Sequence, residues 1–233
     1  MELALNPNRI VNVAIVIALA LVGAHVSTLV LYYSINDPNQ FDFVRLLDLD
    51  YEGNIPTLYS ALIFIFNGCL LALIAQFYRQ QNDRQSIYWL FMAFIFVFLG
   101  IDEGSRLHEE VGDWVENFVN ARGFLYFPWV IPYSVVLLIV GLFYLRFYLR
   151  LDSSLKIRLA FSAILFLSGA LGFELLSAVE ADSVGTTSLR YSVLYTIEES
   201  LELSGLILFM HTLLWVLRLN ITEIKVMITQ PNK

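Results

Sequence analysis

The sequence contains little cysteine, histidine or charge. Of its 233 residues, one is cysteine (Cys69), three are histidine and 15% are charged. A single cysteine excludes an internal disulfide and a Cys-x-x-Cys metal site, so Cys69 is expected to be a packing residue. The chain also lacks a nucleophile elbow, a phosphate-binding loop and a dinucleotide-binding motif. These absences exclude the enzyme classes that depend on such motifs.

Basic residues are fewer than acidic ones, 14 against 21, which gives a net charge of −7. No block of basic residues is present, so nucleic acid is not an expected partner. There is no internal repeat, low-complexity tract or flexible linker either. The chain is therefore expected to form a single domain, 1–233.

Apolar residues are abundant instead. They make up 58% of the chain, and the mean hydropathy is +0.68. Such values are typical of an integral membrane protein that crosses the bilayer several times. Six apolar runs reach the ~20 residues that a helix needs to span the hydrocarbon core. The sequence therefore predicts an all-α membrane protein, one bundle of six transmembrane helices at about 10–33, 55–77, 87–109, 124–148, 157–179 and 191–219.

The first run follows Arg9 and is longer than the apolar part of a secretory signal peptide, so we expect it to be retained as a helix.

A shorter segment after the third run also has a helical pattern. Val111, Trp114, Val115 and Phe118 recur at helical spacing between polar residues. This pattern predicts a short amphipathic helix on the outer membrane surface.

The distribution of lysine and arginine predicts the orientation. With the N-terminus inside, ten basic residues lie inside: Arg9, Arg79, Arg84, Arg146, Arg150, Lys156, Arg158, Arg218, Lys225 and Lys233. Four lie outside: Arg45, Arg106, Arg122 and Arg190. Cytoplasmic loops carry the excess of positive residues. Both termini are therefore expected in the cytoplasm, with the protein in a bacterial inner membrane.

Ionisable residues interrupt three of the apolar runs. On ideal helices, the acidic residues of the fifth and sixth runs lie roughly 9–12 Å below the outer ends of their helices. This depth places them in the same layer of the membrane as the acidic residues at the outer end of the third run. A charge at that depth is costly and marks a functional site by default. The candidate metal ligands are Asp102, Glu103, His108, Glu109, Glu174, Glu198, Glu199 and Glu202.

Helical spacing places Glu198 and Glu202 on one face of the sixth helix, with Tyr195 beside them. Asp102 and Glu109 likewise share a face of the third helix. His108 points away from that face on an ideal helix. A break or bulge near Gly104 would bring it round.

Three explanations can account for so many buried carboxyl groups. Bound metal is favoured, because carboxylates and histidine from several helices form the carboxylate-rich di-metal sites of helix bundles. Iron, zinc or manganese would suit mixed oxygen and nitrogen ligands, and calcium suits them less. A proton or ion pathway is the second explanation, although few polar residues continue it inward. A solvated structural role is the third, and it does not explain three acids within 198–202.

Three further residues border this candidate site. His25 is expected to be a packing residue that forms hydrogen bonds. Glu52 is expected to be solvated, although it could lean over the site. Tyr195 is expected to donate a hydrogen bond rather than to act as a catalytic group.

The motifs Asp-Glu-x4-His-Glu at 102–109 and Glu-Glu-x-x-Glu at 198–202 resemble those of uncharacterised bacterial six-helix membrane proteins. That resemblance implies no activity.

The sequence therefore predicts a membrane metalloprotein, in contact with membrane lipid. The expected function is a metal-dependent oxidoreductase or hydrolase acting on a lipid-like or membrane-near substrate. The alternative is an ion- or proton-linked channel, transporter or sensor that uses the acidic residues.

Overall fold

The computed structural model describes residues 6–34 and 41–220, and in these residues it contains helices and no strands. Lys225 and Lys233, which entered the predicted orientation, lie outside the described residues. Six helical spans are long and apolar enough to cross a membrane, which confirms the predicted fold class. They are α1 (Pro7–Ser34), α3 (Ile55–Gln80), α4 (Gln85–Ser105), α6 (Val130–Arg150), the continuous rod of α7 (Ser153–Leu167), η3 (Ser168–Phe173) and α8 (Glu174–Ser183), and α9 (Leu189–Asn220).

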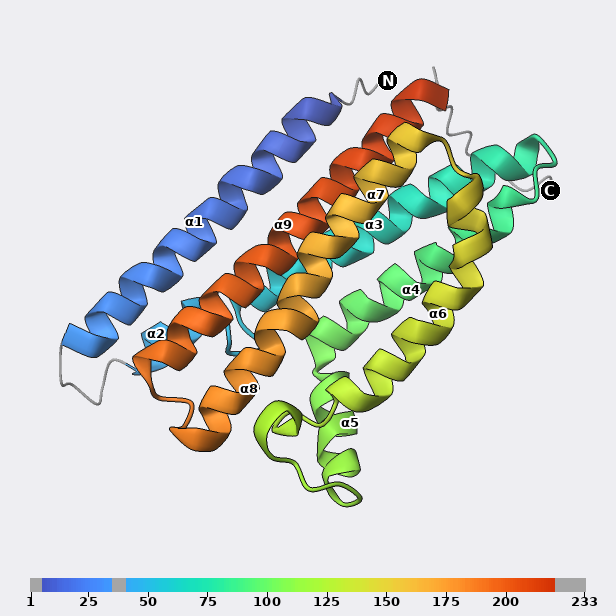
Figure 1. Ribbon diagram of the computed structural model, residues 1–233. Coiled ribbons are helices and arrows are strands. Elements are labelled where there is room, and N and C mark those ends of the chain that lie inside the picture. The colour runs from blue at the N-terminus through green and yellow to red at the C-terminus, as the bar shows by residue number, and fades with distance from the viewer. Residues whose placement is uncertain (1–5, 35–40, 221–233) are drawn as a thin grey trace, which may run out of the picture.

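Helix α9 is the centre of the bundle. It packs against α1, α3 and the rod formed by α7, η3 and α8 (Figure 1). Buried residues occur along its whole length, from Tyr191 to Leu217. A helix with apolar residues all round is typical of such a buried position. The acids of α9 are therefore surrounded by other helices.

Helix α3 begins as the sequence predicts. The side chain of Asn54 accepts a hydrogen bond from the backbone N–H of Thr57 at 3.1 Å, and Pro56 lies in the first turn. The cap satisfies one of the free N–H groups at the helix start, and proline there loses no helical hydrogen bond.

Several predicted boundaries differ from the structure. The rod of α7, η3 and α8 covers 153–183 rather than 157–179. Helix α4 ends at Ser105 rather than 109, because Arg106 adopts a left-handed conformation with φ of 60°. Helix α6 begins at Val130 rather than 124, after a short 3-10 turn, η2 (Gly123–Leu125). A seven-residue helix, α2 (Phe41–Leu47), lies in the loop between α1 and α3.

The predicted amphipathic segment forms helix α5 (Leu107–Glu116). Val115 is buried against the bundle, whereas Trp114 and Phe118 are 64% and 70% exposed, with ring centroids 4.9 Å apart. Their exposure suits a helix that lies along a membrane surface.

Helices α2 and α5 and the turn from α8 to α9 lie at one end of the bundle (Figure 1). We call this the site end. Helix α1 begins and α9 ends at the opposite end.

Candidate functional site

A cavity of about 560 Å³ lies at the site end. It contains every residue predicted as a metal ligand, although α4, α5, α8 and α9 each contribute only part of the set. Eleven carboxyl groups and one histidine line it, and no lysine or arginine is among its described lining residues. The acidic ones are Asp50, Glu52, Asp102, Glu103, Glu109, Asp113, Glu116, Glu174, Glu198, Glu199 and Glu202.

The break between α4 and α5 positions His108. It lies at Arg106, two residues beyond the position proposed from the sequence. The change of direction brings His108 Nδ1 to 3.5 Å from Asp102 Oδ2, and Nε2 to 2.9 Å from Glu52 Oε1. Tyr133 from α6 donates a hydrogen bond to the other oxygen of Asp102 at 2.8 Å. His108 thus connects the loop before α3 to the end of α4.

The charge of His108 follows from these partners. Burial would lower the pKa of the imidazole, but the hydrogen bonds and charges of Asp102 and Glu52 outweigh burial and raise the pKa to about 10. The ring is therefore an imidazolium at neutral pH, with both nitrogens donating. In this arrangement His108 compensates two carboxylates and has no free nitrogen for a metal.

Arg106 compensates a further carboxylate at the rim. Its guanidinium pairs with Glu109 and lies 3.2 Å from Glu52. Glu109 is therefore occupied in the described arrangement. Glu52, which the sequence left as an open candidate, belongs to the site through both Arg106 and His108.

Glu174 and Glu198 form the buried wall. Trp129 Nε1 donates to Glu174 at 3.0 Å, and the Ser177 hydroxyl donates to Glu198 at 3.1 Å. The two carboxyl groups are also within hydrogen-bonding reach of each other. Two carboxylates are acceptors only, so such an approach needs either a shared proton or a cation between them.

A π-helical turn, η3, precedes Glu174 and brings the chain close to α9. A Cβ added at Gly169 would lie 2.6 Å from the carbonyl oxygen of Glu198 and 2.7 Å from Cγ of Glu202. No other residue type fits at this distance. The π-turn, a feature frequent at functional sites, thus packs directly against the acidic turn of α9.

Glu103, Glu199 and Glu202 are half-buried, and no lysine or arginine of the described residues forms an ion pair with them. Their carboxylates suit divalent cations chemically. In the described residues, however, no three His, Cys, Asp or Glu groups converge closely enough to hold an ion. The glutamates border an open cavity, so rotation of their side chains could shorten the distances.

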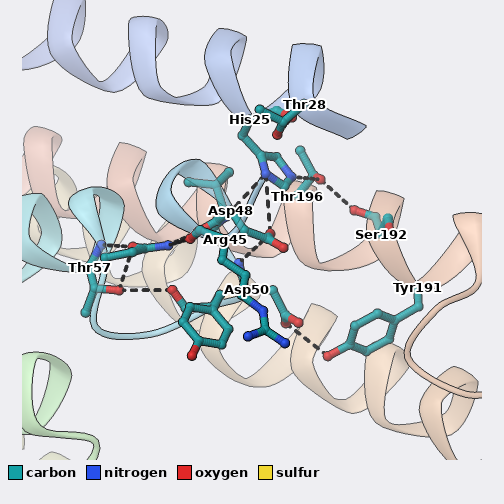
Figure 2. Close-up of polar contacts among 12 residues, drawn as sticks. His25, Thr28, Arg45, Asp48, Asp50, Thr57, Tyr191, Ser192 and Thr196 are labelled. Carbon is teal, nitrogen blue, oxygen red and sulfur yellow. Dashed lines mark hydrogen bonds and ion pairs between the residues drawn. The ribbon is translucent and has the colours of Figure 1, made fainter. Parts of the chain in front are cut away.

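His25 lies outside this cavity, in a separate network that fixes the first loop to α9 (Figure 2). The backbone N–H of Leu49 donates to Nδ1 at 3.2 Å, and Nε2 lies 3.0 Å from the Thr196 hydroxyl. Nδ1 also lies 3.4 Å from Asp48 Oδ1, so the ring connects the first loop to α9 through both of its nitrogens. The packing role expected for His25 fits this geometry.

Asp50 joins that network to the cavity. Tyr191 donates a hydrogen bond to it at 2.9 Å (Figure 2). Desolvation by the surrounding protein raises the pKa of Asp50 to about 7; the bond from Tyr191 opposes the shift, and Asp48 and Glu174 add to it. Tyr195, also buried beside His25 with ring centroids 5.4 Å apart, does not line the cavity.

Sequence reasoning missed Tyr133 and Trp129 as partners of the acids. Trp129 lies six residues after Gly123, and this position gives no signal of a bond to α8.

A comparison with curated proteins and with solved structures finds no match. The chain belongs to the family described as Domain of unknown function (DUF8692), whose model matches residues 13–217, from α1 to α9.

Proposed function

We propose that this protein is an integral membrane metalloenzyme that binds divalent or transition metal ions in the acidic cavity. One observation carries the proposal: eleven carboxyl groups line a single cavity at the end of a membrane-spanning bundle, with no lysine or arginine among the lining residues that the structure describes. Ionised groups inside a membrane need a compensating charge. His108 and Arg106 compensate only the carboxylates of the rim.

The glutamates of the inner wall would hold the metal. Glu103 from α4, Glu174 from α8 and the acids of α9 supply oxygen donors from three directions, which is the arrangement of carboxylate sites in helix bundles. These donors are Glu103, Glu174, Glu198, Glu199 and Glu202. Asp102, His108 and Glu109 would join them only on release from their present partners.

The metal would supply the chemistry, either a bound water of lowered pKa for hydrolysis or a redox centre for oxidation. Iron would indicate an oxidoreductase and zinc a hydrolase. The chain's own residues would orient the substrate and move protons. A glutamate not bound to metal would act as general base, and the imidazolium of His108 would hold Asp102 and Glu52 in place. The substrate would be lipid-like, because the cavity lies at the membrane surface.

The proposal is tested by restoring metal to stripped protein. Iron(II), zinc or manganese(II) is added after chelation, and the thermal unfolding midpoint is measured. At least one of these metals should raise it, because a ligand that binds only the folded state stabilises that state. Glu198→Gln should reduce the rise, since an amide is a poor ligand, whereas the exposed control Glu110→Gln should retain it. No rise with any of the three metals in the parent protein would contradict the proposal.

A second function, proton-linked ion binding, is favoured by the contact between Glu174 and Glu198. If those carboxyl groups are protonated rather than bound to metal, Gln should replace Glu198 without loss of stability. A pathway across the membrane would need further polar groups. On the face of α9 that continues the acidic stripe, the residues below Glu202 that line the adjoining cavity are Gly205, Leu206 and Phe209, and none of them carries a polar side chain. We therefore rank this function second.

The proposed location is a bacterial inner membrane with the site end outside. The support is the ratio of ten basic residues to four in the predicted loops.

A further inference from the structure

A second cavity, of about 520 Å³, lies between α4, α6, α7 and α9. Aromatic pairs make its walls rigid: Phe96 stacks on Phe209 with centroids 4.6 Å apart, and Tyr88 stacks on Phe147 at 4.7 Å. The hydroxyl group of Tyr144 points away into a hydrogen bond with the backbone oxygen of Tyr88 at 2.7 Å. The walls therefore suit a hydrocarbon ligand.

The two cavities are neighbours. Phe64, Leu99 and Phe166 line both the acidic and the apolar cavity. The rings of Phe64 and Phe166 meet edge to face, with centroids 5.7 Å apart. These three side chains mark the boundary at which a polar chamber changes into an apolar one.

The change occurs at the same depth on two facing helices. On α4, Leu99 of the apolar cavity is followed four residues later by Glu103 of the acidic one. On α9, which runs the other way, Glu202 is followed four residues later by Leu206. Residues four apart share a helix face. Each helix therefore presents one continuous stripe, acidic towards the site end and apolar below it.

The apolar cavity is open towards the lipid. Its floor is buried, with Trp89 and Leu206 each 3% exposed. Its rim on α6 and α7 is exposed instead, since 50% of Leu145 and 60% of Ile164 is accessible. Both helices are candidate membrane spans. The opening therefore faces hydrocarbon, and a lipid chain can enter sideways without crossing water.

We infer that the apolar cavity holds one hydrocarbon chain of a polar-headed lipid, whose head group extends past Phe64, Leu99 and Phe166 into the acidic cavity. This inference rests on the proposed function, and it names the substrate class of that site. The lining of α4 runs from Tyr88 to Leu99, which is roughly 16 Å at 1.5 Å per residue. A cavity of this length suits the acyl chain of a membrane lipid that lies along the bundle axis.

Photo-crosslinking tests the inference on the full-length protein. The protein is placed in phosphatidylcholine vesicles that contain a phosphatidylcholine analogue with a diazirine in the middle of one acyl chain, and the labelled peptides are mapped. Crosslinks should reach the floor residues Trp89 and Leu206, which are buried from bulk lipid. Crosslinks confined to exposed residues would overturn the inference.

A matched pair of variants supports the mapping. Gly141 lies on the α6 side of the cavity and Gly23 lies on α1 away from it, and a Cβ added at either meets nothing within 4 Å. Gly141→Trp should therefore fold, fill the opening and lose the floor crosslinks, whereas Gly23→Trp should keep them. Unchanged floor crosslinks in Gly141→Trp would overturn the inference.

The metal content of the same preparations separates this inference from the proposed function. Floor crosslinks in a protein that binds no metal would leave the lipid site standing and remove the metal proposal. Bound metal without floor crosslinks would leave the metal proposal standing and remove the lipid site.

Discussion

His108 determines the charge of the cavity rim more than any other residue. It lies between Glu52 and Asp102 and is 17% exposed. Its identity as a site residue was predicted from the sequence, because a histidine beside four acids follows an apolar run. Its role as a cation could not be predicted, because one of the two carboxylates that hold the proton, Glu52, lies more than fifty residues earlier in the chain.

Replacing His108 by glutamine should lower the stability of the protein in a way that depends on pH. The pKa of His108 is about 10 in the folded protein and about 6.5 in an unfolded chain. The added stability is therefore fully present below pH 6.5 and is lost as the pH rises through 10. Leaving two acceptors without their donor should cost about 1–3 kcal/mol at pH 6.

Thermal unfolding of both proteins at pH 6, 8 and 10 measures this effect. The difference between them should shrink towards pH 10. His211→Gln, on α9 far from the cavity, serves as the control and should show no such trend. A difference that is the same at all three pH values would mean that His108 is not an imidazolium.

Glu174 and Glu198 should behave as one unit. Each single change to alanine removes a carboxyl group that the other contacts, so the double variant should lose less than the sum of the two. The expected coupling is about 0.5–3 kcal/mol, and pairs that share no partner should add within about 0.5 kcal/mol. Glu198→Ala combined with Glu110→Ala provides such a control. Chemical denaturation in detergent measures all the variants, and additive losses in the first pair would disprove the contact.

At the scale of elements, the π-turn η3 is the feature that most directly shapes the site. It could not be predicted, because a π-turn depends on shifted backbone hydrogen bonds that no residue type specifies. The long helices could be predicted, because each needs only an uninterrupted apolar run. The break between α4 and α5 was expected near Gly104, but it occurs at Arg106, where pairing with Glu109 and Glu52 favours a conformation that arginine rarely adopts.

Gly169→Ala should disrupt the site by separating η3 from α9. The added Cβ would lie 2.6 Å from a backbone oxygen of α9, and such overpacking costs about 1–3 kcal/mol. Metal affinity should fall together with stability, because Glu174 would move away from Glu198. Gly172→Ala is the matched control in the same turn, since a Cβ there meets nothing within 4 Å. Equal stability of the two variants would show that the close approach is not needed.

At the scale of the whole molecule, the bundle combines an acidic chamber with an apolar one that opens to lipid. The orientation of this assembly is tested by reporter fusions. The distribution of basic residues predicts that both ends of the chain are in the cytoplasm, so a phosphatase fused after Lys233 should be inactive. The same enzyme inserted beside Gly53, before α3, should be active because that loop would lie outside. The reverse pattern would invert the predicted orientation.

Counting residues along each helix predicted that the acids of α4, α8 and α9 meet at the site end. Asp50, Asp113 and Glu116, which also line the cavity, were not predicted. Counting could not predict how these residues pair. Tyr133 lies in α6 and Trp129 directly precedes it, and this helix starts six residues later than its apolar run suggested. No periodicity aligned the two residues with the acids of α4 and α8.

The central claim is that metal ions compensate the inner glutamates. Elemental analysis of the protein, purified without added metal or chelator, tests this claim most directly. We expect about two tightly held iron, zinc or manganese ions per chain, as in carboxylate di-metal bundles. They should be retained through dialysis, and their content should fall in Glu198→Gln but not in Glu110→Gln. A protein that contains no stoichiometric metal, and whose stability is the same in the parent and in Glu198→Gln, would contradict this claim.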